Sequence, residues 1–199
     1  MSMRERAALL SFFLQVLLFA AACFMLWYQL SAIIAQPAIG LTNLAITALY
    51  PEWVEGIFPQ DADAVLVLTP EALSMQGKAD LQTGEQMGLV INTRIVSYSL
   101  AFYSALHLAT RQANPLERYL YGCAILWCLV VLGTISVCLK QLLVTLGEDD
   151  FASGGLLPIP PFMIALMYQL NTLIVPTLAP VLVWAWQSRG SQLFKQLSR

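Results

Sequence analysis

Four cysteines and one histidine are the residues of this chain most suited to nucleophilic or metal chemistry. All four thiols lie in apolar stretches, which is typical of buried small side chains rather than of a disulfide framework; they are Cys23, Cys123, Cys128 and Cys138. Cys123 and Cys128 would diverge on a helix, and no histidine or carboxylate accompanies them at the spacing of metal ligands. The sequence therefore predicts no metal site and no cofactor.

The sequence leaves open one pair of residues that could form a catalytic nucleophile. His107 is expected near the cytoplasmic end of one apolar stretch and Cys123 near the cytoplasmic start of the next, so the thiol and the imidazole could meet at one depth and form an activated pair. Phosphate-binding glycine loops and the common hydrolase motifs are absent. None of the twelve carboxylates lies in an apolar stretch, where an ion-coupled transporter would need one. We expect a protein that is not an enzyme, with an intramembrane thiol enzyme using Cys123 and His107 as the alternative.

Amide side chains mark the first apolar stretch at regular intervals. Gln15, Ala22, Gln29 and Gln36 follow one another every seven residues. A seven-residue repeat keeps one helix face toward a neighbouring helix, and amides with small residues suit helix contacts in lipid. We expect this stripe to face protein, and take Gln15 and Gln29 as candidates for binding a partner. The alternative is that Gln29 and Gln36 only mark the outer membrane interface.

Two prolines four residues apart interrupt the last apolar stretch. Pro176 and Pro180 each lack an amide donor and displace a carbonyl one turn earlier, so we expect a kinked helix whose freed carbonyls need other partners. Helical spacing puts Gln169 and Thr172 on the same face as these prolines and Asn171 on the opposite one. We expect the polar face to pack inward, either as a groove for a partner or as helix packing alone.

Four apolar stretches would position these residues, at about 7–35, 95–110, 119–146 and 161–186. With 58% hydrophobic and 11% charged residues, a soluble chain of 199 residues could not cover its apolar surface with polar side chains. Three stretches exceed the roughly 20 residues needed to cross a hydrocarbon core. The second reaches that length only by starting near Leu89.

Basic residues collect on one side of these stretches. With both termini in the cytoplasm, seven basic and two acidic residues lie inside, and three basic and ten acidic residues lie outside, in agreement with the net charge of −2. The positive-inside rule then favours a mainly α, integral membrane protein with a four-helix transmembrane bundle and both termini cytoplasmic. Binding of nucleic acid would need a concentrated basic face, which is absent.

The third stretch and the outer segments complete the predicted organisation. Small residues share one face of the third stretch with a lysine near its outer end; they are Gly122, Gly133, Ser136 and Lys140.

The sequence divides into five predicted parts. Residues 1–36 are the N-terminus and first span, and 37–94 are an extracytoplasmic α+β segment that is helical and then has strands near 64–69 and 87–93. Residues 95–146 are a hairpin of two spans, 147–160 an outer acidic loop, and 161–199 the kinked fourth span and cytoplasmic tail. Glu52 and Glu55 in the second division are further candidates for binding a partner, with a solvated face as the alternative.

Several segments resemble the exosortase H-associated membrane proteins. They are residues 26–30 (LWYQL), 48–55 (ALYPEWVE), 88–98 (GLVINTRIVSY), 168–170 (YQL) and 174–181 (IVPTLAPV). The resemblance implies a multi-pass protein of the inner membrane of a Gram-negative bacterium that assists an exosortase acting on proteins with C-terminal sorting signals. The chain does not resemble the sortase itself, whose Cys, Arg and His motifs are not found. The expected partners are membrane lipid and an exosortase-like membrane protein, and the sequence leaves homo-oligomerisation open.

Overall fold

The computed structural model describes most of the chain. The described residues are 3–61, 63–70, 72, 87–110, 114–148, 151 and 159–189. Several basic residues used in the topology argument lie outside them; these are Lys78, Arg111, Lys195 and Arg199. Most of the predicted outer acidic loop also lies outside the described ranges.

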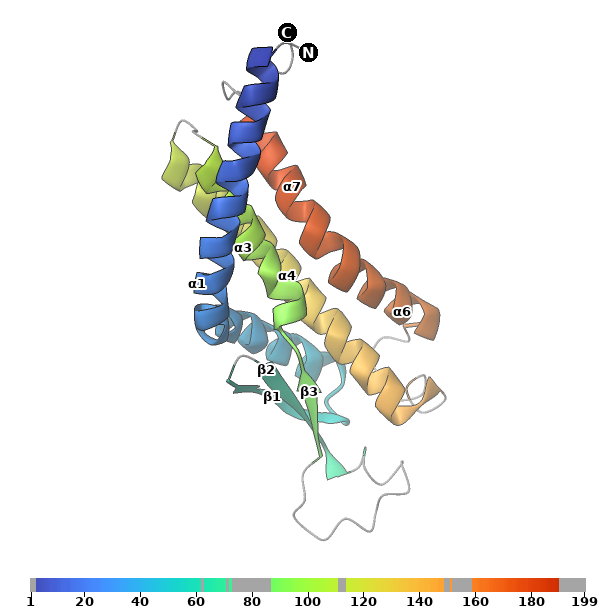
Figure 1. Ribbon diagram of the computed structural model, residues 1–199. Helices are drawn as coiled ribbons and strands as arrows, with labels where there is room; N and C mark the ends of the chain where they lie inside the picture. Colours follow the sequence, from blue (N-terminus) through green and yellow to red (C-terminus); the bar gives the residue numbers. More distant parts are fainter. Residues whose placement is uncertain are drawn as a thin grey trace.

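Four long helical stretches lie side by side, with a small sheet at one end of them (Figure 1). They are α1 (Met3–Leu49), α3 (Arg94–Ala109), α4 (Pro115–Leu146) and a last stretch made of α6 (Pro161–Gln169), η1 (Leu170–Ile174) and α7 (Val175–Ser188). Three of them, Leu10–Leu49, Pro115–Leu146 and Pro161–Ser188, are long and apolar enough to cross a membrane. The prediction of a mainly α membrane protein is therefore confirmed, with three long apolar candidate spans.

The second predicted span is shorter than expected. The 16 residues of α3 extend about 24 Å, less than the roughly 30 Å of a hydrocarbon core. The helix does not begin near Leu89, because residues Gly88–Ile91 form strand β3. β-Branched and apolar residues at this point pair with a neighbouring strand instead of extending the helix.

Helix α1 continues well past the end of the predicted first span. Its 47 residues include Pro37, whose missing amide removes one helical hydrogen bond and bends a helix without necessarily ending it. Figure 1 shows the helix changing direction in its second half and then running between the other helices and the sheet. Only the short turn at residues 50–53 then separates α1 from the first strand of the sheet.

The sheet has three antiparallel strands in the order β1 (Val54–Gln60), β2 (Asp63–Leu68) and β3 (Gly88–Ile91). The two strands expected near 64–69 and 87–93 are β2 and β3, and they pair with each other. Strand β1 was not predicted, because Gly56 and Pro59 are both unfavourable in strands. Proline is tolerated there because β1 is an edge strand.

An aromatic cluster joins the residues after α1 to Phe151, which follows α4. The rings of Tyr50 and Trp53 stack at 5.5 Å between centroids, and the ring of Phe151 lies 5.3 Å and 5.7 Å from them. All three side chains are buried. The sheet is therefore tied to the helices through apolar contacts as well as through the continuous α1.

The small-residue face of α4 packs against its neighbours as its composition suggested. Gly122, Gly133 and Ser136 are all buried. A Cβ atom on Gly133 would lie 2.7 Å from Val96 Cγ1, so the absence of a side chain lets α3 approach closely. Lys140 is partly buried, with its Nζ 5.4 Å from the centroid of the Tyr168 ring.

Candidate partner-binding surface

The predicted glutamine stripe of α1 points away from the rest of the chain. Gln15, Ala22, Gln29 and Gln36 are all exposed. The buried Ser31 lies about 200° around the helix from Gln29, at roughly 100° per residue. These amides therefore do not face this chain's own helices, so any protein neighbour that they have must be another molecule, and contact of the stripe with protein stays a prediction.

The surroundings of the stripe are apolar and uncovered. Leu14, Leu17 and Leu18 are 60%, 69% and 70% exposed, and none of the most apolar window of α1 is buried inside the chain. In a bilayer this helix face would contact lipid, where an amide without a hydrogen-bonding partner is costly. The glutamines therefore make this face a better surface for a helix with polar groups than for lipid alone.

The fourth helical stretch presents its predicted face only in part. Thr172, Pro176 and Pro180 are buried within this chain, whereas Gln169 is exposed. Asn171 is also buried, and its Nδ2 donates a hydrogen bond to Ser136 Oγ at 2.8 Å. Gln169 therefore does not pack inward with the prolines as expected. Asn171, expected either to meet a second neighbour or to lie near the outer surface, contacts α4.

A π turn explains this change of face. Within η1 the amide of Val175 donates to the carbonyl of Leu170, five residues earlier, so the turn holds one more residue than an α-helical turn. Nearby hydroxyls bond to backbone carbonyls: Thr172 Oγ1 donates to Tyr168 O at 2.6 Å, and Thr177 Oγ1 donates to Ile174 O at 2.9 Å. Residues that share one face at 3.6 residues per turn therefore do not stay on one face across such a turn.

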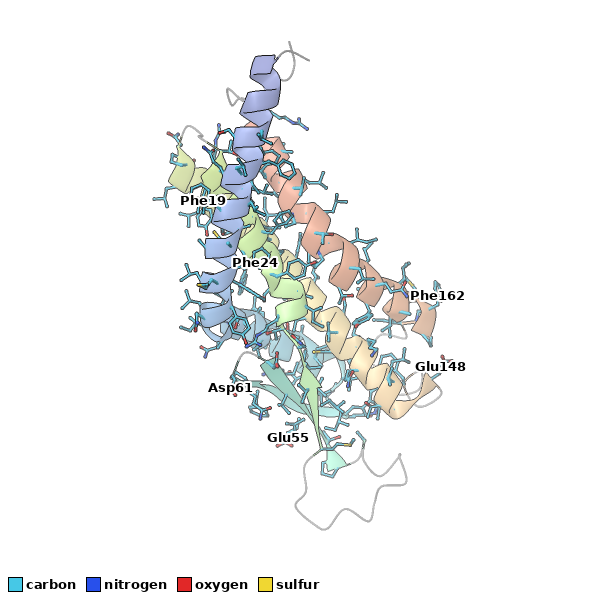
Figure 2. The ribbon with its side chains drawn as sticks, viewed as in Figure 1. Phe19, Phe24, Glu55, Asp61, Glu148 and Phe162 are labelled. Atoms are coloured by element: carbon cyan, nitrogen blue, oxygen red, sulfur yellow. The ribbon has the colours of Figure 1, made fainter. Side chains whose placement is uncertain are left out.

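The acidic candidates lie at the sheet end of the molecule. Glu52 and Glu55 are exposed, and the backbone carbonyl of Glu52 accepts a hydrogen bond from Thr69 Oγ1. Figure 2 shows Glu55, Asp61 and Glu148 all toward the end of the molecule that carries the sheet. These carboxylates therefore lie together at one end of the molecule, and the prediction that this end is the outer side stays a prediction.

The two members of the alternative thiol pair have different surroundings. Cys123 lines a groove of about 540 Å³ between α1, α3 and α4, together with Cys23, Ser104 and Tyr119. His107 does not line this groove; it is 5% exposed and its ring packs against Tyr119, with 5.3 Å between centroids. The thiol thus faces an apolar groove, whereas the imidazole is enclosed among aromatic rings.

A polar network that sequence reasoning missed joins three helices at the end opposite the sheet. Tyr103 OH donates to Gln187 Oε1 at 2.7 Å, Gln187 Nε2 donates to Arg118 O at 2.9 Å, and Arg118 Nη1 donates to Gln187 O at 2.6 Å. Tyr103, Arg118 and Gln187 come from α3, α4 and α7. The only signal in the sequence was that Arg118 and Gln187 each stand at the end of an apolar stretch. The network links α3, α4 and α7 to one another and does not involve the exposed face of α1.

Comparison with known proteins supports one family. The family model described as "Exosortase H-associated membrane protein" matches residues 6–191. No curated protein and no solved structure is significantly similar to the chain. The match covers every described helix and strand apart from the first turn of α1, including the exposed glutamines, the aromatic junction and the proline-containing last helix. The chain therefore belongs to the family of exosortase H-associated membrane proteins.

Proposed function

We propose that this protein is a non-enzymatic inner-membrane accessory protein that binds an exosortase-type sorting enzyme within the membrane. The binding surface is the glutamine face of α1, defined as Gln15, Ala22, Gln29 and Gln36. Its exposure on the side of α1 away from the bundle carries the proposal. Family membership supplies the kind of partner.

The glutamine face is long enough to cross the whole hydrocarbon core of a bilayer. From Gln15 to Gln36 the helix rises about 32 Å, close to the roughly 30 Å of a hydrocarbon core. Heptad spacing favours a left-handed crossing of about 20° with the partner helix. Gln15, Gln29 and Gln36 would then each meet a polar group of the partner at a different depth.

The proposed topology places both termini in the cytoplasm and the sheet outside. The rings of Phe12 and Trp184 stack at 5.7 Å between centroids, so the first part of α1 and the last part of α7 lie at the same end of the bundle. The sheet lies at the other end (Figure 1). An even number of crossings produces this arrangement when the shorter α3 crosses the bilayer together with the three long spans.

The decisive variant combines Gln15→Leu, Gln29→Leu and Gln36→Leu. Leucine keeps the helical propensity and raises the hydrophobicity, so the variant should still insert. Each lost interhelical polar contact is worth about 0.6–2 kcal/mol. Recovery with an affinity-tagged exosortase, measured by quantitative mass spectrometry after gentle detergent extraction, should fall at least tenfold at equal membrane abundance.

Gln169→Leu is the matched control, because Gln169 is also an exposed amide but lies on another helix. Its recovery should stay within twofold of the parent protein. Equal recovery of the triple variant and the parent would remove the glutamine face as the binding surface. A loss with Gln169→Leu alone would move the contact to the last helix.

The thiol-enzyme alternative is tested separately by Cys123→Ser. The proposal requires no chemistry from this thiol, so exosortase-dependent processing of a sorted substrate in cells should proceed at the parent rate. Processing is followed as the ratio of cleaved to uncleaved substrate on an immunoblot. A loss of processing with unchanged protein abundance and unchanged exosortase binding would favour the enzyme.

A further inference from the structure

The second half of α1 has one face covered by the sheet. We call residues 37–49 (PAIGLTNLAITAL) the surface segment; it contains no charged residue. Ile39, Thr42 and Ile46 are buried, and this helix packs on β1. Asn43 Oδ1 accepts a hydrogen bond from the amide of Ile57 at 2.7 Å. The sheet is therefore fixed to one side of the surface segment by apolar and polar contacts.

The opposite face of the surface segment is apolar and uncovered. Leu41 and Leu44 are 47% and 68% exposed, and Gly40 and Ala48 are exposed with them. A Cβ atom added to Gly40 would meet no atom within 4 Å. At about 100° per residue these four positions centre on the side opposite Ile39 and Ile46.

The length of α1 and its bend at Pro37 determine where the surface segment lies. The 47 residues of α1 extend about 70 Å, more than twice the thickness of a hydrocarbon core. The glutamine face up to Gln36 already accounts for one crossing, and Pro37 then bends the helix. Figure 1 shows the segment between the other helices and the sheet. Because the sheet covers one face of the segment, the uncovered opposite face is the one on the side of those helices.

We propose that the surface segment lies in the membrane interface, with Leu41, Leu44 and Ala48 inserted among lipid chains of the leaflet on the sheet side. Exposed apolar residues at the end of the first crossing, Leu30 and Ile33, continue into this face, because both belong to the same helix. Lysine and arginine are absent from the segment, so insertion is driven by apolar contact rather than by anionic headgroups. The segment thereby holds the three-stranded sheet flat against the membrane.

Depth measurement on the purified full-length protein tests this proposal without a partner protein. Single cysteines replace Leu41, Leu44 and Ala48 in a variant whose four native cysteines are alanine, reconstituted in phosphatidylcholine vesicles and spin-labelled. The ratio of accessibility to oxygen over accessibility to a water-soluble nickel chelate should be at least threefold higher at these positions than at Gln60→Cys on the exposed end of β1. Adding phosphatidylglycerol should change the ratio by less than twofold.

Each other outcome overturns the proposal. A nickel accessibility equal to that of Gln60→Cys would place the face in water, and low accessibility to both reagents would show that a second copy of the chain covers it. If the cysteine-free variant does not fold, a photoreactive benzoylphenylalanine at Leu44 in the parent chain replaces the measurement, and it should form lipid adducts at least fivefold more often than the same group at Gln60. Because no exosortase is present, these results are independent of the glutamine face.

Discussion

Replacing Trp53 by alanine should lower the free energy of unfolding by about 3–5 kcal/mol, the usual cost of removing a buried aromatic side chain. Trp53 is only 1% exposed, and its ring packs on Tyr50 and Phe151. Tyr50 and Trp53 lie after α1 and Phe151 lies after α4, so the cavity would loosen contacts between distant segments. The midpoint of urea unfolding in detergent, followed by circular dichroism, measures the change.

Phe58→Ala is the matched control for this variant. Phe58 is an aromatic residue of the neighbouring strand β1 but is 53% exposed, so its removal should cost less than about 1 kcal/mol. Equal losses for the two variants would show that the aromatic cluster does not hold the junction. A large loss for Phe58→Ala alone would mean that the outer face of the sheet is covered in solution.

The helices could be predicted from the sequence because hydrophobic length is a property of the chain itself. The predicted stretches 119–146 and 161–186 correspond closely to α4 and to the run from α6 to α7. The end of α1 could not be predicted in the same way, since Pro37 is equally compatible with a stop and with a bend. Packing of the following residues on the sheet decides in favour of continuing the helix.

Prediction of the strands rested on local composition, and this composition was sufficient to predict only β2 and β3. β2 (DAVLVL) and β3 (GLVI) are rich in β-formers. β1 (VEGIFPQ) is not, and it forms because Ile57 pairs with Leu66 and the backbone of Ile57 bonds to Asn43 on α1. Pairing between segments outweighs local propensity there.

The candidate site was predictable as a pattern but not in its direction. Seven-residue spacing correctly placed Gln15, Gln29 and Gln36 on one face of α1, yet nothing in the spacing says whether that face meets this chain or another one. On the last helix the predicted face holds only in part, because Thr172, Pro176 and Pro180 are buried whereas Gln169, just before the π turn, is exposed. Spacing is reliable only within an uninterrupted α-helix.

Gly122→Ala should be the second strongly destabilising change, at about 1–3 kcal/mol for overpacking a well-packed interior. A Cβ atom at this position would lie 2.0 Å from the hydroxyl oxygen of Tyr103 and 2.1 Å from its Cζ. Tyr103 cannot move away freely, because its hydroxyl donates to Gln187, which in turn bonds to Arg118. The added methyl group would therefore disturb the contacts of α3, α4 and α7 together, and urea unfolding in detergent would report the loss.

We expect Gly40→Ala to stabilise the protein, so its comparison with Gly122→Ala isolates the effect of the Tyr103 ring. Gly40 also lies inside a helix, but a Cβ atom there meets nothing within 4 Å, and alanine should stabilise the helix by about 0.5–1 kcal/mol. Adding Tyr103→Leu to Gly122→Ala should recover part of the loss, because the ring that the methyl group strikes is gone. If Gly122→Ala and Gly40→Ala shift the unfolding midpoint in the same direction, close approach of α3 and α4 at Gly122 does not stabilise the bundle.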